Sequence, residues 1–238
     1  MILGMLKYHL LMLIREPANM FFGFGLPFLN LFLVSGTSEE NPDFMNIAFP
    51  IFIVIAVLVL CFTDSALSHA HSRQIKFLRR LRMTPVKPIT YIHTGIMIRL
   101  GVVLIFAVMF SMFTSIFFDL NMTNRNWFSI LGVLVLVFAM FYFIGMFLAN
   151  VFKNARTSPN ALNIVFWVFI LLSNAFFPIE AMPDIMQTIT QNTPTIYAIS
   201  LLQSAWLGTD ILYGNSLIIV SCITVVFGLL SLKFFKYE

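Results

Sequence analysis

Few residues in this 238-residue sequence are of a type that performs chemistry, and their spacing forms no catalytic or metal-binding pattern. The histidines are His9, His69, His71 and His93. His69 and His71 are two positions apart, and side chains at that spacing do not face each other on a helix. Each of the two cysteines, Cys61 and Cys222, lies inside an apolar run, where a disulfide framework or a thiolate metal site is not expected. We therefore predict no metal site and no nucleophile–base set.

Asp64 is the only acidic residue inside a predicted membrane span. An acid within a membrane is costly and by default suggests a functional site. Because Asp64 lies near the end of its span, pairing with Arg73 or another nearby cation is the alternative. The sequence also has no G-x-x-x-x-G-K-[ST] phosphate loop, so we expect no nucleotide or other cofactor to be bound by this chain itself.

A dense group of cations lies in the first half of the chain. Six of the fourteen Lys and Arg residues fall between Arg73 and Lys87, although the chain is 60% hydrophobic and only 10% charged. From Ser72 to Met83 apolar residues recur at helical spacing, and Pro85 follows as a helix stop. This pattern predicts a short basic amphipathic helix, which either rests on anionic lipid headgroups or docks a cytoplasmic partner. The candidate docking residues are Arg73, Lys76, Phe77, Arg79, Arg80, Arg82, Thr84 and Pro85.

The first 17 residues predict a second amphipathic helix. Its shared apolar face consists of Leu3, Leu6, Leu10, Leu13 and Ile14. Such a helix lies flat at a membrane interface, either as a simple anchor or in support of docking. No small-residue cleavage site follows it, so we expect it to be retained and not removed as a signal peptide.

Residues 173–183, SNAFFPIEAMP, predict a helix end, a turn and a new helix start. Pro178 ends the first helix because the residue before a proline is pushed away from helical dihedrals, and Pro183 can begin the next helix. The segment is either a structural helix–turn–helix that does not cross the membrane or the outer gate of a pathway. The candidate gate residues are Asn174, Phe176, Phe177, Pro178, Glu180, Met182 and Pro183.

These candidates lie among long apolar runs, which identify an all-α integral membrane protein. A spanning helix needs ~20 mostly apolar residues. We predict six transmembrane helices over residues 18–36, 44–63, 100–118, 127–152, 157–177 and 211–232, with an extension of the second past Asp64 left open. Residues 185–208 are uncharged but rich in amide and hydroxyl groups, whose burial in lipid is costly. We expect them to form short re-entrant helices at the outer interface.

The distribution of cations predicts the orientation. Thirteen of the fourteen Lys and Arg residues fall on one side of the predicted membrane, and Arg125 alone falls on the other. Loops rich in Lys and Arg stay in the cytoplasm, so both termini are predicted to be cytoplasmic. Residues 1–238 then form a single transmembrane domain, with a cytoplasmic amphipathic helix at 1–17, a cytoplasmic loop at 68–95 and an outer re-entrant region at 178–210. We expect no nucleic-acid partner.

Two stretches resemble the permease subunits of ABC exporters of the type-2 membrane family. They are KFLRRLRMTPVKPITYIHTGIMIRL, which begins at Lys76, and SNAFFPIEAMPDIMQTITQNTPTIYAISLLQ, which begins at Ser173. That family shares an L-R-x-T-P motif after span two and an S-G-x-x-F-P-x-E-x-M-P pattern after span five. The similarity covers nearly the whole chain. Asn174 stands here in place of the usual glycine. The Arg-Glu pair that often precedes the basic helix in the family is also missing.

The resemblance implies a dimer of two permease copies with the transport path between them, and two copies of a separate ATPase on the cytoplasmic side. It implies that residues 73–83 form the coupling helix, which sits in a groove of the ATPase, and that the N-terminal helix is a second contact. ATP and Mg²⁺ would be bound by the ATPase.

We therefore predict a transport subunit and not an enzyme. It would move an amphiphilic or hydrophobic cargo, such as a drug, antibiotic, lipid or peptide, out of a bacterial cell across the plasma membrane, and a homodimer is expected. Two alternatives stay open: a permease for polysaccharide or lipid-linked glycan export, and a membrane protein of immunity or sensing that binds a toxin without pumping it.

Overall fold

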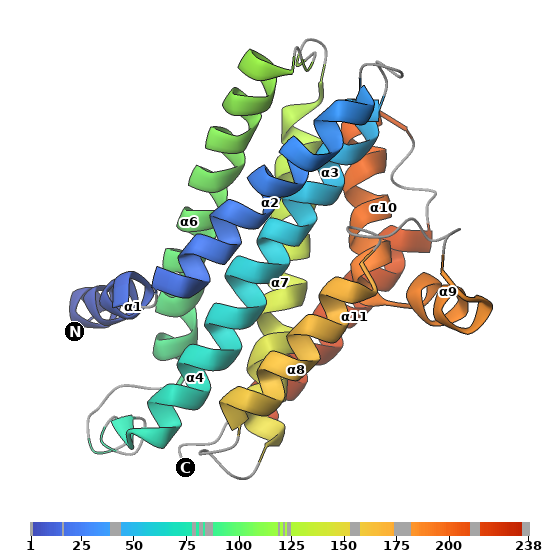
Figure 1. The fold of residues 1–238 in the computed structure, drawn as a ribbon. Helices are drawn as coiled ribbons and strands as arrows, with labels where there is room; N and C mark the ends of the chain where they lie inside the picture. Colours follow the sequence, from blue (N-terminus) through green and yellow to red (C-terminus); the bar gives the residue numbers. More distant parts are fainter. Residues whose placement is uncertain are drawn as a thin grey trace.

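The computed structural model is a bundle of helices, shown in Figure 1. The structure describes residues 2–15, 17–38, 44–77, 80, 83, 88–118, 120, 122, 125–152, 158–173, 182–209 and 215–234. No strand occurs in these ranges. The elements are α1 (Ile2–Arg15), α2 (Pro17–Ser38), α3 (Phe44–Val57), the π-helical η1 (Leu58–Thr63), α4 (Asp64–Gln74), α6 (Pro88–Phe117), α7 (Trp127–Val151), α8 (Ser158–Leu171), α9 (Asp184–Gln191), α10 (Pro194–Leu207) and α11 (Asn215–Lys233).

Four helical stretches of the described chain are both long and apolar enough to cross a membrane. They cover Met45–Gln74, Ile89–Phe117, Trp127–Val151 and Asn215–Lys233. The other two predicted spans correspond to α2 and α8. α8 has 14 residues and ends at Leu171, short of the end predicted at residue 177. At 1.5 Å per residue it is ~21 Å long, less than the hydrocarbon thickness. The count of six spans therefore stays a prediction.

The cytoplasmic loop predicted at 68–95 is largely helical. α3, η1 and α4 continue from the second span to Gln74, and α6 begins at Pro88, so only residues 75–87 separate the two helices. The extension of the second span past Asp64 therefore occurs, and the cytoplasmic placement of residues 68–95 stays a prediction. In the structure Ser68, His69 and Ser72 are buried against other helices.

The π-helical segment η1 and the start of α4 pack closely against α7. A π-turn is wider than an α-turn and often lies near functional sites. A Cβ added at Gly145 of α7 would lie 2.5 Å from the Ser65 hydroxyl oxygen and 3.0 Å from the Phe62 carbonyl oxygen. One turn later, Ala149 belongs to a buried cluster with Ala66 and Ala70 of α4. Small residues on α7 therefore let η1 and α4 approach its backbone.

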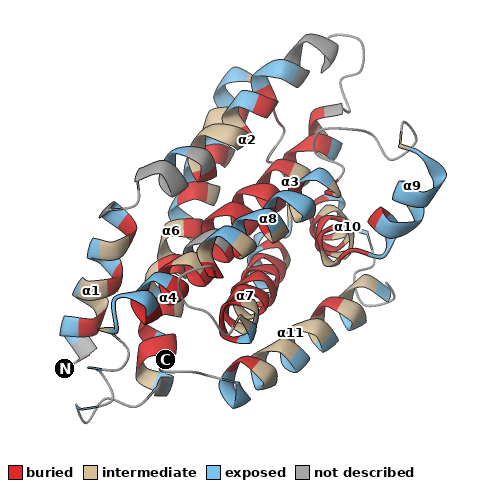
Figure 2. Cartoon of the chain, turned by 60° about the horizontal axis from the view of Figure 1, so that its bottom comes forward, coloured by how far each residue is buried: buried red, intermediate tan, exposed pale blue. Residues whose placement is uncertain are grey.

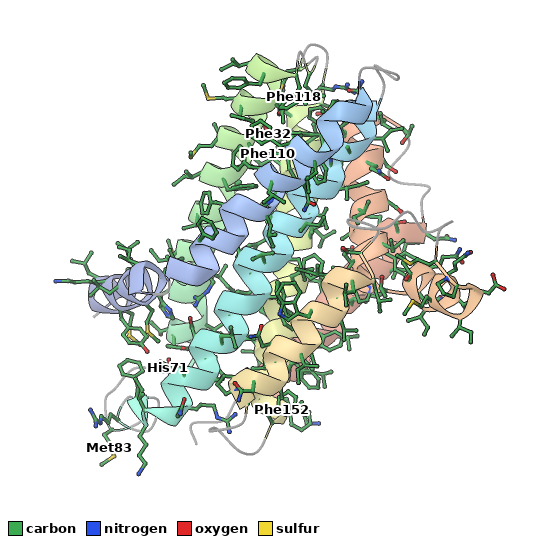
Figure 3. The ribbon with its side chains drawn as sticks, in the orientation of Figure 1. Phe32, His71, Met83, Phe110, Phe118 and Phe152 are labelled. Carbon is green, nitrogen blue, oxygen red and sulfur yellow. The ribbon has the colours of Figure 1, made fainter. Side chains whose placement is uncertain are left out.

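Phenylalanines fill the space between α2, α3 and α6. Phe28 makes edge contacts with Phe106 and Phe110, whose ring centroids lie 6.2 and 5.2 Å away. Phe49 of α3 stacks on Phe110 at 5.6 Å. Figure 3 shows Phe110 and Phe32 in the upper part of this interface. Such aromatic pairs contribute beyond their buried area and tie α6 to the bundle.

Two helices lie beside the bundle and not within it. α1 lies next to the lower half of α6 and runs across the direction of the spans, and α9 projects on the opposite side (Figure 1). Figure 2 shows α7 and α3 as the most buried elements, whereas α9 is largely exposed. α9 and α10 are the two short helices that the sequence predicted, and their re-entrant placement in the membrane stays a prediction.

Candidate functional site

The basic segment after α4 does not continue α4 as one helix. α4 ends at Gln74, and Lys76 adopts a left-handed backbone with φ 57°. The Lys76 N–H donates to the Arg73 carbonyl at 3.0 Å, and the Arg80 N–H donates to the Lys76 carbonyl at 3.2 Å. A left-handed residue is a common helix end, although lysine adopts it at a cost of ~1 kcal/mol. The helix predicted from Ser72 to Met83 is therefore interrupted at Lys76, while Phe77 and Arg80 beyond it are again helical.

Arg73 points into the bundle and not toward a partner. Only 3% of its surface is exposed. Its Nη1 donates to the carbonyls of Ala149 at 2.7 Å and Phe152 at 3.1 Å, at the C-terminus of α7. A cation there satisfies carbonyls that lack helical partners and interacts favourably with the helix dipole. The structure thus moves Arg73 from the candidate docking residues to a contact that fastens α4 to α7.

The basic segment is joined to α1. The Tyr8 and Phe77 rings stack with centroids 4.1 Å apart and planes 6° from parallel. The Tyr8 hydroxyl lies 2.8 Å from the Ser72 hydroxyl at the end of α4. Lys76 and Arg80 are exposed beside this contact, and Met83 is 89% exposed. Figure 3 places Met83 at the lower edge of the molecule. The two amphipathic elements that the sequence singled out thus form one surface.

A buried polar cluster connects α1 to α6. The His9 Nε2 donates to the Tyr91 carbonyl at 3.1 Å, and the Arg99 Nη1 lies 3.5 Å from the His9 Nδ1. Because the Nε2 hydrogen bonds to a carbonyl, the Nδ1 of neutral His9 is left as the acceptor for Arg99. Burial, and then the charge of Arg99, lowers the pKa of His9 from 6.5 to about 3. His9 is therefore neutral at physiological pH.

The same cluster reaches α4 and α7. The His69 Nε2 lies 3.1 Å from the Asn150 Oδ1, and the His69 ring lies 5.9 Å from the Tyr91 ring. The Tyr142 hydroxyl donates to the Ile92 carbonyl at 3.3 Å. The sequence does not reveal this convergence, because residues brought together from four helices leave no spacing signal along the chain.

Asp64 begins α4, directly after the π-helical segment. Its side chain lies outside the described residues, so both predictions for it stay open. Two hydrogen bonds of Arg73 run to the Ala149 and Phe152 carbonyls at the C-terminus of α7. Among the described residues, no three His, Cys, Asp or Glu side chains come close enough to hold a metal ion.

Pro183 precedes α9 as its N-cap residue, as the sequence predicted for the start of this helix. The Gln187 side chain donates to the Met182 carbonyl at 2.8 Å, which closes the first turn. α10 begins at Pro194 and ends at Leu207, and Gly208 follows as its C-cap with a φ of 74°, which suits a residue without a Cβ. α10 packs between α3 and α11, with Leu202 buried.

Several predicted site residues lie outside the described part of the chain. From the docking segment these are Arg79, Arg82, Thr84 and Pro85. From the outer segment they are Asn174, Phe176, Phe177, Pro178 and Glu180. Their predicted roles therefore remain predictions.

A comparison with protein families decides the class of the protein. The family model described as ABC-2 type transporter matches residues 2–207. The chain belongs to this family. The ABC-2 match spans α1 to α10, so it includes both the basic segment after α4 and the outer segment before α10. A search of curated proteins found no match.

Membership gives this ABC-2 type transporter its general role. The family consists of membrane-spanning permease components that generally work with an ABC ATPase partner, and such a component is not itself catalytic. The chain is thus a multi-pass membrane protein with a transport function, and its helical bundle is the permease.

Proposed function

We propose that this chain is the permease subunit of an ATP-driven exporter in a bacterial plasma membrane. Two permease copies would form a homodimer around the path, and two copies of a separate ATPase would bind ATP and Mg²⁺ on the cytoplasmic side. The cargo would be amphiphilic or hydrophobic, such as a drug, antibiotic, peptide or lipid. Both termini would face the cytoplasm.

The observation that carries the coupling part of this proposal is the contact between Tyr8 and Phe77. It joins the basic segment to α1, while Lys76 and Arg80 stay exposed beside it. An ATPase that presses on this surface would move α1 and the end of α4 together. His9 and Arg99 would pass the movement to α6, and Arg73 would pass it to α7.

The outer segment would complete the path at the other end. In the predicted orientation, Asn174, Phe176, Phe177, Pro178 and Glu180 precede Met182 and Pro183 at the start of α9. We assign them to an outer gate that opens when the ATPases close.

Charge reversal tests the docking surface. Arg79→Glu and Arg80→Glu together are expected to abolish co-purification with the ATPase and the ATP hydrolysis of the complex, because the reversal removes the cationic surface that is proposed to dock the ATPase. Lys233→Glu makes the same type of charge change on the same predicted side, at the exposed end of α11. This control should leave co-purification and ATP hydrolysis unchanged. A complex that keeps full activity after reversal at both arginines would contradict the docking role.

The same preparation separates the alternatives. A chain that purifies alone from cells containing every ABC ATPase of its host would favour a non-pumping immunity or sensor protein. Stimulation of ATP hydrolysis by a lipid-linked glycan and not by small amphiphiles would favour the glycan exporter.

A further inference from the structure

A cavity of about 500 Å³ lies between α6 and α7, next to α3 and α10. This volume falls within the range of ~300–1,000 Å³ that is typical of ligand sites. The cavity lies at the end of the bundle that carries Trp127, opposite the end where α4 meets the basic segment. In the predicted orientation this is the outer half of the membrane.

The cavity has a buried floor and an exposed rim. Phe49, Leu134 and Trp206 line it and are almost completely buried. Val108 and Met112 also line it, and each is 60% exposed. The opening therefore lies on the surface of the bundle, between side chains that are exposed in this chain.

Small residues on α6 create the space. Ala107, Ser111 and Ser115 recur every four residues and all line the cavity. The Ser111 hydroxyl donates to the Ala107 carbonyl at 2.6 Å, so its polar group is satisfied within the helix and the wall stays apolar. Small residues at such spacing often permit close helix packing, whereas Ser111 and Ser115 here border a hollow.

The lining determines the chemistry of the occupant. Water does not fill an apolar hollow without polar partners, and an empty one loses the dispersion contacts of its walls. A flexible hydrocarbon chain that enters from the lipid side needs no polar partner and makes dispersion contacts with the walls. No polar headgroup fits the floor, because its residues are apolar or aromatic.

A cation lies beside the wall of the cavity. Trp127 and Trp206 meet edge to face with centroids 6.2 Å apart, and Trp residues gather at the level of lipid headgroups. The Arg125 guanidinium lies over the Trp206 ring at 4.6 Å. It donates to the Trp206 carbonyl at 2.7 Å and to the Asn46 Oδ1 at 2.8 Å, which fixes its position. A fixed guanidinium, always positively charged, is well suited to a phosphate.

We propose that this cavity binds one acyl chain of a phospholipid, whose phosphate lies beside Arg125. The proposal does not depend on the chain being a pump. The lipid would be a resident part of the protein that fills the gap between α6 and α7.

Quenching of Trp206 by brominated acyl chains tests the proposal. Trp206 is only 2% exposed, so a bromine on a chain reaches it through the cavity and not from the general lipid surface. The full chain carrying Trp127→Phe and Trp167→Phe keeps Trp206 as its single tryptophan. In vesicles of phosphatidylcholine brominated on its acyl chains, we expect strong quenching relative to unbrominated vesicles. Absence of quenching would overturn the proposal.

A filled cavity provides the matched comparison. Ser111→Phe adds a ring to the cavity wall, and we expect most of the quenching to be lost. Ile105→Phe adds a ring on the same helix, at a position that is 61% exposed and does not line the cavity, so quenching should persist. Equal quenching in the two variants would overturn the proposal. If Ser111→Phe does not fold, Ser115→Leu replaces it with a smaller filling group.

Lipid retention tests the headgroup contact independently. Native mass spectrometry of the unaltered chain after delipidation should show one retained phospholipid, and none retained would overturn the proposal. Arg125→Gln is expected to weaken retention roughly tenfold, the size of a hydrogen bond to a charged group. Unchanged retention would overturn the phosphate contact.

Discussion

At the scale of single residues, Arg73 and Arg80 have different roles although both belong to one basic cluster. Arg73 is buried and bonded to carbonyls at the end of α7, whereas Arg80 is exposed. Arg73→Ala leaves those carbonyls unsatisfied, so we expect a loss of about 2 kcal/mol in stability. Arg80→Ala should change stability very little.

The measurement is thermal unfolding of the two purified variants in the same detergent. A marked fall in the unfolding temperature of Arg73→Ala with an unchanged value for Arg80→Ala would support the assignment. Equal values for both variants would mean that Arg73 does not fasten α4 to α7.

His9 makes stability depend on pH. Its folded pKa of about 3 lies below the unfolded value of 6.5, so the unfolded chain takes up a proton first as the pH falls. The stabilising contribution is complete above pH 6.5 and is lost as the pH decreases from 6.5 toward 3. At pH 5 the loss is about 2 kcal/mol, since each pH unit contributes about 1.4 kcal/mol.

Unfolding of the native chain and of His9→Gln at pH 7.5 and pH 5 measures this contribution. Glutamine keeps a hydrogen-bond donor for the Tyr91 carbonyl but does not titrate. The variant should therefore lose less stability between the two pH values than the native chain does. Identical losses would assign the acid sensitivity to other groups.

At the scale of elements, the stacked rings of Tyr8 and Phe77 are the link between α1 and the basic segment. Tyr8→Phe keeps the stack and removes the hydroxyl contact with Ser72, whereas Tyr8→Ala removes both. We expect Tyr8→Ala to reduce transport strongly while the ATPase still binds, and Tyr8→Phe to have a small effect.

The energy of this link can be measured with a double-mutant cycle. Tyr8→Ala, Phe77→Ala and the double variant should give an interaction energy of about 1 kcal/mol, the usual size for a stacked aromatic pair. Additive effects of the two substitutions would show that α1 and the basic segment are not coupled through these rings.

The sequence predicted elements better than it predicted their ends and contacts. Long apolar runs and flanking prolines located α3, α7, α10 and α11, because these signals are local. The break at Lys76 could not be predicted, since lysine has no preference for a left-handed backbone and the turn is imposed by packing. The inward direction of Arg73 was equally hidden, because its partners lie 76 and 79 residues away.

At the scale of the whole molecule, the orientation in the membrane rests on the distribution of cations. Met83 and Thr209 lie at opposite ends of the bundle and are exposed. Met83 lies in the basic segment, while Thr209 lies just after α10, near Trp206, whose carbonyl binds Arg125. If the cation-rich end is cytoplasmic, a reagent that cannot cross membranes should reach the two positions from opposite sides.

Cysteine labelling tests this prediction. Met83→Cys and Thr209→Cys are placed separately in a chain whose native Cys61 and Cys222 are replaced by alanine. In intact cells, a charged maleimide should label Thr209→Cys and leave Met83→Cys unlabelled, and inside-out vesicles should reverse the result. Labelling of Met83→Cys from outside intact cells would place the basic segment on the wrong side for an ATPase, and the coupling proposal would fail with the orientation.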